Sequence, residues 1–407
     1  MPAIRTRMPH VVLWLPTSIK ACREILRGVL QYVHFHGPWA VHLIDERSVK
    51  KKLFDPVAWG CTGMIVDMRD RAQAERLLAA GVPAVLSHVP DDVLAAKHPL
   101  SGRCRLQCEN GPIGTQAAEH LLERRYRHFA FVGDVQGVSW SEARRDAFCR
   151  RLAKEGYSCT VYPRLSPSER EDFSREQAKL CGWLKALPKP VALFAANDAR
   201  ARQVLDSCLK TDLLVPHDIA VLGVDNDELI CETAHPQLSS IQMTTERAGF
   251  EAARALDALM RETAPARRRP TVIPFGFSHL VSRRSTETVQ IADPLVARAV
   301  EFIRINAGIV VTVEDLVRHL HVSRRWLEKR FKAHMGRTVY AEILHLRLER
   351  VQTLLRESSE PIEEIADACG FASASHLGTQ FRQHFETTPA SYRRRTREGA
   401  APPRAAP

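Results

Sequence analysis

The sequence predicts an α/β part of two lobes followed by an all-α domain with two helix-turn-helix units. The chain has 407 residues, which exceeds the roughly 250–300 residues that one hydrophobic core can hold. Residues 10–281 alternate short apolar runs with amphipathic stretches, whereas every segment after Pro294 has a helical pattern. This change of pattern predicts separate domains on the two sides of Asp293-Pro294.

Short apolar runs in the first part predict strands, and the stretches between them predict helices. Such runs suit strands that are buried on both faces and followed by a helix, so they favour parallel sheets. About 265 residues of this pattern suit two doubly wound lobes, and the cleft between such lobes is the expected small-molecule site. The expected strands are 10–15, 39–44, 63–66, 82–86, 128–132, 191–195 and 218–224, and the expected helices are 22–33, 73–80, 113–124, 142–154, 199–209 and 245–260.

The same changes of pattern predict the domain boundaries. We expect a flexible N-terminus at 1–9, the two-lobed domain at 10–281 and a polar linker at 282–294. The helical domain is expected at 295–396. The tail at 397–407 is rich in Ala, Pro and Gly and is expected to be disordered.

Positive charge is concentrated near the C-terminus. The formal net charge is +11, and residues 295–407 alone carry 18 Lys and Arg against 13 Asp and Glu, which suggests a polyanionic partner. The ten cysteines are scattered and include no C-x-x-C pair, which indicates reduced thiols and therefore a cytoplasmic protein. A DNA-binding protein of the cytoplasm is expected to be associated with the nucleoid. Pro16 ends the first apolar run too early for a signal peptide, and no segment approaches the roughly 20 apolar residues of a membrane span.

The α/β part carries no motif of an enzyme. G-x-S-x-G, G-x-x-x-x-G-K-[ST] and H-E-x-x-H are all missing, and the seventeen histidines show no metal-ligand spacing. We therefore predict no catalytic residue, no metal site and no cofactor.

The strongest signal in the chain is an internal repeat in the helical part. Each copy is a short helix, a tight turn and a second helix, and together they predict helix-turn-helix units at 313–334 and 362–385. Such a unit places the N-terminal part of its second helix in the DNA major groove. An apolar-striped helix at 339–356 separates the units, so that their second helices could enter successive grooves about 34 Å apart. The matching pairs are Val313 and Ile362, Leu316 and Ile365, Ser323 and Ser373, Leu327 and Leu377, and Phe331 and Phe381.

Side chains on the second helix of each unit are candidates for DNA contact, since Arg reads guanine and Glu can accept from cytosine. The candidates are Ser323, Arg324, Arg325, Glu328 and Lys329 in the first unit and Ser373, Ser375, His376, Thr379 and Gln380 in the second. The residues expected in the core are Trp326, Leu327, Phe331, Leu377, Phe381 and Phe385. Thr312-x-x-Asp315 predicts a capping box, Ser323 and Ser373 predict N-caps, and Gly370 predicts a left-handed turn. A helical packing domain with a solvated charged face is the alternative, which the repeat, the caps and the basic Arg393-Arg394-Arg395 disfavour.

Residues 295–395 resemble the AraC/XylS family of activators. The family signature is matched by Ile362-x-x-Ile-Ala-x-x-x-Gly-Phe371, Ser373, His376-Leu377, Phe381-Arg382-x-x-Phe385 and Thr388-Pro389-x-x-Tyr392-Arg393. The resemblance implies binding to double-stranded promoter DNA.

Polar residues at strand ends mark the rim of the expected cleft. Asn197-Asp198 and Asp225-Asn226 each follow an apolar run, and Trp140 and Arg144 begin a helix after Gly133. Carboxylates and Arg, together with an aromatic ring face, are what a neutral sugar requires. Taken singly, Asp198 and Asp225 are equally well explained as helix caps, but the set as a whole favours a sugar site.

The α/β part resembles the LacI-type, periplasmic-binding-protein-like fold. The resemblance rests on Leu214-Val-Pro-His-Asp218-Ile-Ala-Val-Leu-Gly-Val-Asp225-Asn226 and on Gly249 within the helix at 245–260. It implies that Arg144, Asp198 and Asp225 bind the sugar and that Trp140 stacks on it. It also implies that Arg23 and Asp67 contribute from the other lobe.

The order of the two parts resembles a family of bacterial sugar-operon activators. Shared features are Asp198-Ala-Arg-Ala-Arg202, Gly223-x-Asp-Asn-x-Glu228, Arg283-Arg-Ser-Thr286, Asp293-Pro294 and Leu327-Glu-Lys-Arg-Phe-Lys332. The resemblance implies a homodimer in which a pentose, D-xylose, closes the lobes, so that the protein engages promoter DNA and recruits RNA polymerase. Ala21-Cys22 stand where polar or aromatic residues facing the sugar are expected. A different sugar, or a role as repressor, therefore remains an alternative.

Two other classes of protein are disfavoured. A solute-binding protein is opposed by the missing signal peptide and the attached helical domain. A sugar-modifying enzyme is opposed by the absence of a positioned nucleophile or base.

Overall fold

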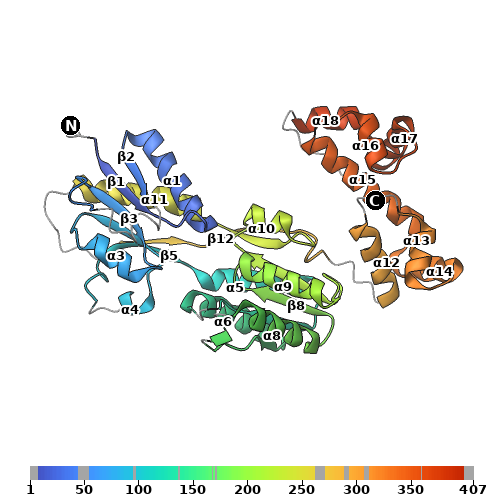
Figure 1. The fold of residues 1–407 in the computed structure, drawn as a ribbon, viewed down its shortest axis with the longest axis horizontal. Helices are drawn as coiled ribbons and strands as arrows, with labels where there is room; N and C mark the ends of the chain where they lie inside the picture. Colours follow the sequence, from blue (N-terminus) through green and yellow to red (C-terminus); the bar gives the residue numbers. More distant parts are fainter. Residues whose placement is uncertain are drawn as a thin grey trace. The chain divides into compact units, whose positions relative to one another are not determined.

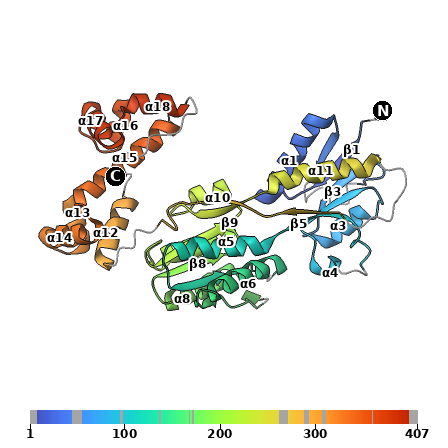
Figure 2. The same cartoon turned by 180° about the vertical axis from the view of Figure 1, so that it is seen from behind.

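The computed structural model describes residues 8–44, 55–94, 98–135, 138–166, 168–169, 172–261, 271–287, 293–306, 311–358 and 360–397. The chain divides into two compact units, Met1–Thr288 and Val289–Pro407, which we call the first and the second unit. Both are shown in Figure 1 and, from behind, in Figure 2. Among the described residues, none of the helices is long and apolar enough to cross a membrane.

The N-terminal lobe of the first unit is built on a six-stranded sheet. Its strand order is β11-β5-β4-β3-β1-β2, and all neighbouring strands are parallel. The strands are β1 (His10–Trp14), β2 (Ala40–Ile44), β3 (Gly63–Asp67), β4 (Ala84–Ser87), β5 (Cys104–Cys108) and β11 (Val272–Phe275). The helices of this lobe are α1 (Lys20–His36), α3 (Arg71–Leu78), α4 (Asp91–Leu94) and α11 (Thr245–Arg261).

Alternate side chains of β1 enter two different hydrophobic clusters. Val11 and Leu13 pack in the cluster that holds the apolar faces of α1 and α11, whereas Val12 and Trp14 pack in the cluster that holds α3. Figures 1 and 2 agree that α1 and α11 lie together on one side of the sheet and α3 on the other. Burial on both faces explains the continuous apolar run at β1.

The C-terminal lobe repeats this architecture. Its strand order is β12-β10-β9-β8-β6-β7, with β12 antiparallel to β10 and the other pairs parallel. The strands are β6 (His128–Val132), β7 (Cys159–Val161), β8 (Val191–Ala195), β9 (Ile219–Val224), β10 (Ser239–Met243) and β12 (Phe277–Val281). The helices are α5 (Asn110–Glu123), α6 (Ser139–Ala153), α8 (Phe173–Ala186), α9 (Asp198–Lys210) and α10 (Glu228–Thr233).

The chain crosses between the lobes three times. The crossings follow β5, β10 and β11, each at the carboxyl end of its strand. They lie side by side, because the Glu109 N–H donates to the Phe275 carbonyl at 2.7 Å and the Thr244 N–H donates to the Gly276 carbonyl at 2.8 Å. Three adjacent crossings form the hinge region between the lobes, and the carboxyl ends of β5, β10 and β11 lie at it.

The predicted fold class is confirmed, and every expected strand and helix of the α/β part is present. The sequence missed strands β5, β7, β10, β11 and β12, and it also missed α4, α8 and α10. The missed strands are short or mix polar with apolar residues, as in Ser278 and His279 of β12, so they carry a weaker hydrophobic pattern.

Residues 282–287 pack on the first unit, whereas the sequence places them in the linker. Ser285 and Thr286 are fully buried. The Val221 N–H donates to the Ser285 carbonyl at 2.9 Å, and Arg124 Nε donates to the Thr286 carbonyl at 2.7 Å. These hydrogen bonds extend the lobe beyond β12. The predicted flexible N-terminus and disordered tail lie, but for residues 8, 9 and 397, outside the described residues.

The second unit is helical and has two separate hydrophobic clusters. One includes Leu316, Leu327 and Phe331, and the other includes Leu377 and Phe381. Each cluster is the core of one predicted helix-turn-helix unit. The helices are α12 (Pro294–Ile305), α13 (Val313–Leu320), α14 (Arg324–Met335), α15 (Val339–Glu357), α16 (Ile362–Ala368), α17 (Ala374–Phe385) and α18 (Pro389–Arg397).

The predicted helix ends of the second unit are confirmed. Thr312 and Asp315 form a reciprocal capping box at the start of α13. Ser323 and Ser373 are the N-caps of α14 and α17, and each hydroxyl accepts a backbone N–H of the first helical turn. Gly370 has a φ of 74°, as the tight turn between α16 and α17 requires.

Candidate functional site

Asp225 lies in the turn that follows β9, at the cleft edge of the C-terminal lobe. Its φ is 105° and that of Asn226 is 50°, in the left-handed region that residues other than glycine rarely adopt. Strain of this kind, of order 1–3 kcal/mol per residue, is concentrated at functional sites. Within the described part of the chain, the half-buried Asp225 carboxylate accepts no hydrogen bond. It is therefore available to a ligand.

Charged side chains from both lobes act on Asp225. They are Arg144 of α6, Lys20 and Glu24 of α1, and His88 after β4. Burial raises the pKa of Asp225 and Glu24 adds to this, while the charge of Arg144 works in the opposite direction. The nearby positive charges only partly offset the cost of burying this carboxylate. Such a group favours ligands that donate hydrogen bonds to it, such as hydroxyl groups.

Arg144 is 5% exposed and is held from several sides. Its Nε donates to Asn110 Oδ1 at 3.0 Å, and its Nη1 donates to the Ala196 carbonyl at 2.6 Å. Its Cζ lies 4.8 Å from the centre of the Trp140 ring. The structure thus brings together Arg144, Trp140 and Asp225, which the sequence predicts as one site.

Asp198, at the start of α9, is buried, and its contact with the sugar stays a prediction. Its carboxylate accepts the Asp227 N–H at 2.7 Å and the Ser240 hydroxyl at 2.5 Å. Burial, with the nearby charge of Asp225, raises the pKa of Asp198 to about 8. Asn197 acts as a helix cap, because its side chain accepts the Arg200 N–H at 2.9 Å. Both side chains are therefore used to hold the turns around α9.

Asp67 is also buried, at the carboxyl end of β3, and its oxygens are occupied by its own lobe. Arg69 Nη2 and His88 Nδ1 lie 2.7 and 2.8 Å from Asp67 Oδ2, and the Ser87 hydroxyl donates to the same oxygen at 3.2 Å. Burial alone would raise the pKa of Asp67, but His88 and Arg69 hold it well below its usual range. The direct contact between Asp67 and the sugar stays a prediction.

Cys22, Asp67 and His88 are side chains of metal-binding types that lie close together. Arg69 Nη2 lies 2.7 Å from both Cys22 Sγ and Asp67 Oδ2, so a guanidinium already supplies positive charge there. Burial raises the pKa of the Cys22 thiol to about 12, which keeps it protonated. The cluster is explained by ion pairing with Arg69.

Polar contacts join the two lobes beside the hinge. Lys20 Nζ donates to the Asn226 carbonyl, and to Gln242 Oε1 at 3.1 Å. Arg23 pairs with Asp227 across the lobes, with Arg23 Nη2 2.9 Å from Asp227 Oδ2. Among the predicted ligand residues, Arg23 and Asn226 therefore act in this bridge between the lobes.

The sequence missed Lys20, Glu24, His88 and Gln242. His88 directly follows a strand, so the strand-end rule that selected Asp225 would have found it. Lys20 and Glu24 stand one turn apart at the start of α1, a spacing that places them on one face. No pattern in the sequence pointed to Gln242 as a site residue, because the strand that carries it, β10, was not predicted.

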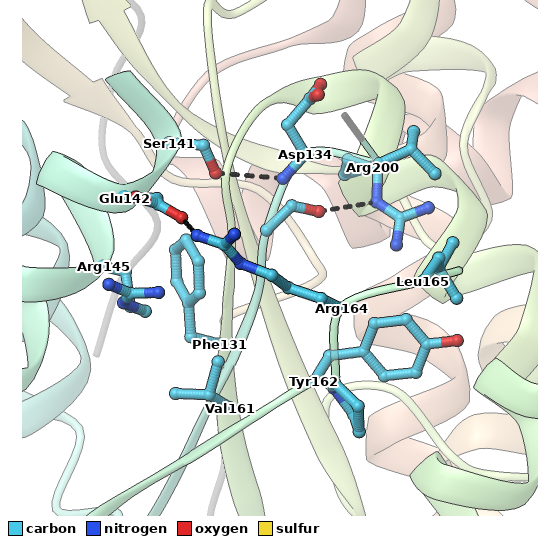
Figure 3. A pocket seen from close by; sticks show the side chains of 13 residues that line it. Phe131, Asp134, Ser141, Glu142, Arg145, Val161, Tyr162, Arg164, Leu165 and Arg200 are labelled. Carbon is cyan, nitrogen blue, oxygen red and sulfur yellow. Dashed lines mark hydrogen bonds and ion pairs between the residues drawn. The ribbon is translucent and has the colours of Figure 1, made fainter. Parts of the chain in front are cut away.

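A separate pocket opens at the carboxyl ends of β6 and β7 (Figure 3). Arg200 lines it, but its Nε donates to the Gly133 carbonyl at 3.0 Å and its Nη1 pairs with Glu176. Figure 3 shows the Arg164 guanidinium directed at Glu142. These charges compensate one another, and none of the predicted ligand residues lines the pocket.

The first predicted recognition helix, α14, presents basic side chains to solvent. Arg324, Arg325 and Lys329 are exposed, and Arg324 Nη1 pairs with Glu314 at 2.5 Å. Glu328 is half-buried and accepts the Val339 N–H at 3.4 Å, which ties it to the start of α15. The exposed face of α14 therefore consists mainly of arginine and lysine, as binding to phosphate and guanine requires.

Trp326 is not a core residue, contrary to the prediction. It is 38% exposed, whereas its neighbour Leu327 is fully buried. The Arg330 guanidinium lies over the Trp326 ring at 4.7 Å, and Arg330 also pairs with the buried Asp293. The ring is therefore a surface feature of α14.

The second predicted recognition helix, α17, presents a more neutral surface. Ser375, His376 and Thr379 are exposed, and Gln380 is half-buried. Leu377, Phe381 and Phe385 form the buried face of the helix, as predicted.

Comparison with known proteins agrees with both units. Residues 118–286 match the periplasmic binding protein-like domain family, and residues 316–395 match a helix-turn-helix domain family. The xylose operon regulatory protein of Haemophilus influenzae is 30% identical over 377 residues, which cover 91% of this chain and 94% of that protein. The xylose operon regulatory protein of Escherichia coli K12 is 29% identical over 392 residues, covering 95% and 97%.

Solved structures agree in fold. The xylose-binding transcription activator XylR matches with a TM-score of 0.78 and 28% identity, over 96% of this chain and 98% of that chain. The transcriptional regulator CelR in its cellobiose complex matches 69% of this chain and 85% of its own, with a TM-score of 0.53 and 22% identity.

The predictions of the AraC-type and LacI-type resemblances, and of a regulator in place of an enzyme, are confirmed by these comparisons. The alternatives of a transport protein and a sugar-modifying enzyme have no support among these relatives. The chain belongs to the family of the xylose operon regulatory proteins, transcription regulators that join a periplasmic-binding-protein-like domain to a DNA-binding AraC-type helix-turn-helix domain.

Proposed function

We propose that a pentose, D-xylose, binds between the lobes of the first unit and raises the affinity of the second unit for promoter DNA. The observation that carries this proposal is the half-buried Asp225 carboxylate, held in a strained turn beside Arg144 and Trp140. The choice of xylose is supported by relatives named as regulators of a xylose operon and by a similar structure described as xylose-binding.

In the proposed complex, Asp225 accepts hydrogen bonds from sugar hydroxyls while Arg144 donates to a sugar oxygen. Trp140 covers a face of the sugar ring. Lys20 and Glu24 contact the sugar from the N-terminal lobe. The form in which the lobes are closed therefore makes contacts with the sugar that the open form lacks. A sugar that binds the closed form more tightly shifts the population toward it.

The other predicted ligand residues have indirect roles in this proposal. Asn197 and Asp198 hold the turns that carry the site, and Asp67 fixes His88. Arg23 and Asn226 stabilise the closed arrangement through their contacts across the lobes.

DNA recognition is proposed to use both helix-turn-helix units of a homodimer. Bases and phosphates are contacted from α14 by Arg324, Arg325 and Lys329 and from α17 by Ser375, His376, Thr379 and Gln380. Ser323 and Ser373 cap these helices and donate N–H groups to phosphate, and Glu328 orients α14 against α15. The dimer acts on the nucleoid in the cytoplasm and recruits RNA polymerase.

A thermal-shift comparison of pentoses and hexoses tests the sugar. Ligands that bind only the folded state stabilise it, by about 2.7 kcal/mol at a concentration of 100 Kd. We expect D-xylose to raise the melting temperature of the first unit and D-ribose, L-arabinose, D-glucose and D-galactose to leave it unchanged. A shift with another sugar alone would replace the effector, and no shift with any sugar would contradict sugar sensing.

The DNA-binding half is tested by selection from random duplexes with the full chain. The selected duplex should be bound more tightly with D-xylose than without it, and the logarithm of the affinity should fall steeply with the logarithm of salt concentration. Transcription from a template carrying the selected site then decides between activator and repressor, since xylose increases the transcript only in the first case.

A further inference from the structure

Helix α15 connects the two helix-turn-helix units and belongs to both of their cores. Val339, Ile343 and Leu346 pack in the cluster of the first helix-turn-helix unit, with α12 to α14. Leu348 and Val351 pack in the cluster formed with α16 to α18. The change from one core to the other takes place between Leu346 and Leu348, and Arg347 occupies the position between them.

The Arg347 guanidinium reaches both helix-turn-helix units. Its Nη2 donates to the Val311 carbonyl at 2.9 Å, just before α13 begins. Its Nη1 donates to the Gly370 carbonyl at 3.2 Å, in the turn between α16 and α17. One rigid, planar group thus bonds to the residue before the first helix-turn-helix unit and to the turn of the second helix-turn-helix unit.

The surroundings of Arg347 make these two hydrogen bonds hard to replace. Burial lowers the pKa of Arg347, so the guanidinium has lost part of its water shell. A guanidinium carries donors in a fixed fork, whereas a lysine ammonium is a single point of charge. Lysine at this position would keep the charge but could not hold both carbonyls in the same geometry.

A second contact supports the same coupling. His345 Nδ1 of α15 lies 3.1 Å from His384 Nε2 of α17. The second recognition helix is therefore held to α15 directly, while the first is held through the core that Leu346 shares with Leu327 and Phe331.

We propose that Arg347 is a positioning residue that fixes the first recognition helix, α14, relative to the second, α17, and thereby sets the spacing between the two DNA segments that one chain accepts. The inference rests on the proposed DNA binding by both units. The inference goes beyond the proposed function because it assigns selectivity for DNA spacing to a residue that is not among the proposed DNA contacts. One inserted base pair displaces the second segment by about 3.4 Å and rotates it by about 34°, more than a rigid pair of helices can follow.

The test measures binding of the full chain to spacing variants of the selected duplex. Single base pairs are inserted or deleted between the two contacted segments, and Kd is measured for each duplex by fluorescence anisotropy. For the unchanged protein we expect each insertion or deletion to weaken binding by about tenfold or more, the usual effect of a mismatched base pair. For Arg347→Lys and Arg347→Met we expect the range of affinities across the spacings to shrink to about threefold.

Arg318→Met is the matched control. It also removes an arginine from the helix-turn-helix domain, but Arg318 lies in α13, is 79% exposed and pairs with Asp315. This control should keep the steep preference for one spacing even if its affinity falls. The inference is overturned if the Arg347 variants keep the wild-type spacing preference with all affinities lowered by a common factor. It is also overturned if the unchanged protein accepts all spacings equally.

A second measurement keeps the inference testable if the Arg347 variants fold poorly. Spin labels on exposed positions of the two helices, Ala333 and Gln383, report the distance between α14 and α17. The chain has ten cysteines, so the labels are attached through non-natural amino acids. One narrow distance in the unchanged domain is expected, and a broad distribution there would overturn the inference. If no duplex is selected at all, the proposed DNA binding has failed, and the label distance compared between the unchanged protein and Arg347→Lys still tests the role of Arg347, which an unchanged distribution would overturn.

Discussion

The negative charge of Asp225 does not stabilise the folded protein when no ligand is bound. Its backbone lies at a φ of 105°, and burial raises its pKa, which means that folding disfavours the charged form. Residues that cost stability in this way are retained where a ligand needs them. At the scale of single residues, the cleft is therefore marked by an unfavourable arrangement that a bound sugar would relieve.

Replacing Asp225 with Asn tests this reading. Asn fits the left-handed turn and keeps the size of the side chain but removes the charge. We expect the melting temperature without sugar to stay the same or rise, because the neutral amide removes a charge that burial, and then Glu24, disfavour in the folded protein. Loss of charge-assisted hydrogen bonds should raise the Kd for D-xylose about 10- to 100-fold, as isothermal titration calorimetry would measure.

Asp206→Asn is the control for that change. Asp206 is an exposed carboxylate on α9 that pairs with Arg202. Its replacement should alter neither stability nor sugar binding. Equal sugar affinity in wild type and Asp225→Asn would remove Asp225 from the proposed site.

At the scale of elements, the N-terminal lobe depends on close packing of α1 against α11. A Cβ atom added to Gly249 would lie 2.2 Å from the Ile25 carbonyl oxygen, and one added to Gly28 would lie 1.9 Å from the Glu246 carbonyl oxygen. The two backbones approach so closely that neither glycine can gain a side chain without moving a helix. Because α11 follows directly on a crossing between the lobes, such a shift would also reach the hinge.

Gly249→Ala should lower the stability of the first unit by about 1–3 kcal/mol, the usual cost of overpacking. Gly182→Ala is the matched control, because no atom lies within 4 Å of the added Cβ in α8. That control should be more stable by about 0.5–1 kcal/mol through helix propensity alone. Differential scanning calorimetry of the full chain separates the two outcomes. A stable Gly249→Ala variant would show that α1 and α11 can move apart at little cost.

Helix α5 holds the end of the first unit through His120 and Arg124. His120 Nε2 lies 3.0 Å from Thr286 Oγ1, and Arg124 Nε donates to the Thr286 carbonyl. Burial, and then the charge of Arg124, lowers the pKa of His120 to about 3 from 6.5. Between those values the unfolded chain binds more protons than the folded one, so stability falls as the pH drops below about 6.5.

His120→Gln should reduce that loss of stability. Glutamine keeps a hydrogen-bonding group near Thr286 but cannot be protonated. Wild type should lose stability relative to the variant by up to about 1.4 kcal/mol per pH unit between about pH 6 and pH 4. Urea unfolding at a series of pH values measures the difference. Parallel profiles for the two proteins would mean that His120 takes up a proton in the folded state as readily as in the unfolded chain.

The sequence predicted those features that depend on neighbouring residues. Ser323 and Ser373 were predicted as caps because a capping side chain acts within three residues of itself. The use of the Asp198 carboxylate by Ser240 could not be predicted, since it depends on β10, a strand with a weak apolar pattern. The stacking of Arg330 on Trp326 could not be predicted either, since Arg330 is also held by Asp293, 37 positions earlier.

At the scale of the whole molecule, the connection between the units is anchored at both ends. Thr286 is bonded to α5 in the first unit, as described above. In the second unit, the buried Asp293 carboxylate accepts the Leu295 N–H at 2.9 Å, which caps α12, and pairs with Arg330 of α14. The last described residues of the first unit and the first described residues of the second are therefore each bonded to a helix of their own unit.

Coupling between sugar and DNA must be reciprocal if one conformational equilibrium links them. When D-xylose raises the affinity for the selected duplex by some factor, the duplex must raise the affinity for D-xylose by the same factor, typically 5- to 150-fold. Calorimetric titration of D-xylose into the protein, with and without saturating duplex, measures the effect of the duplex on the affinity for D-xylose. Fluorescence anisotropy with and without D-xylose measures the effect of D-xylose on the affinity for the duplex. Asp225→Asn should retain the basal DNA affinity and lose both effects. Unequal factors would show that a further equilibrium, such as assembly of the dimer on DNA, takes up part of the free energy, and repeating both titrations over a range of protein concentrations would then reveal it.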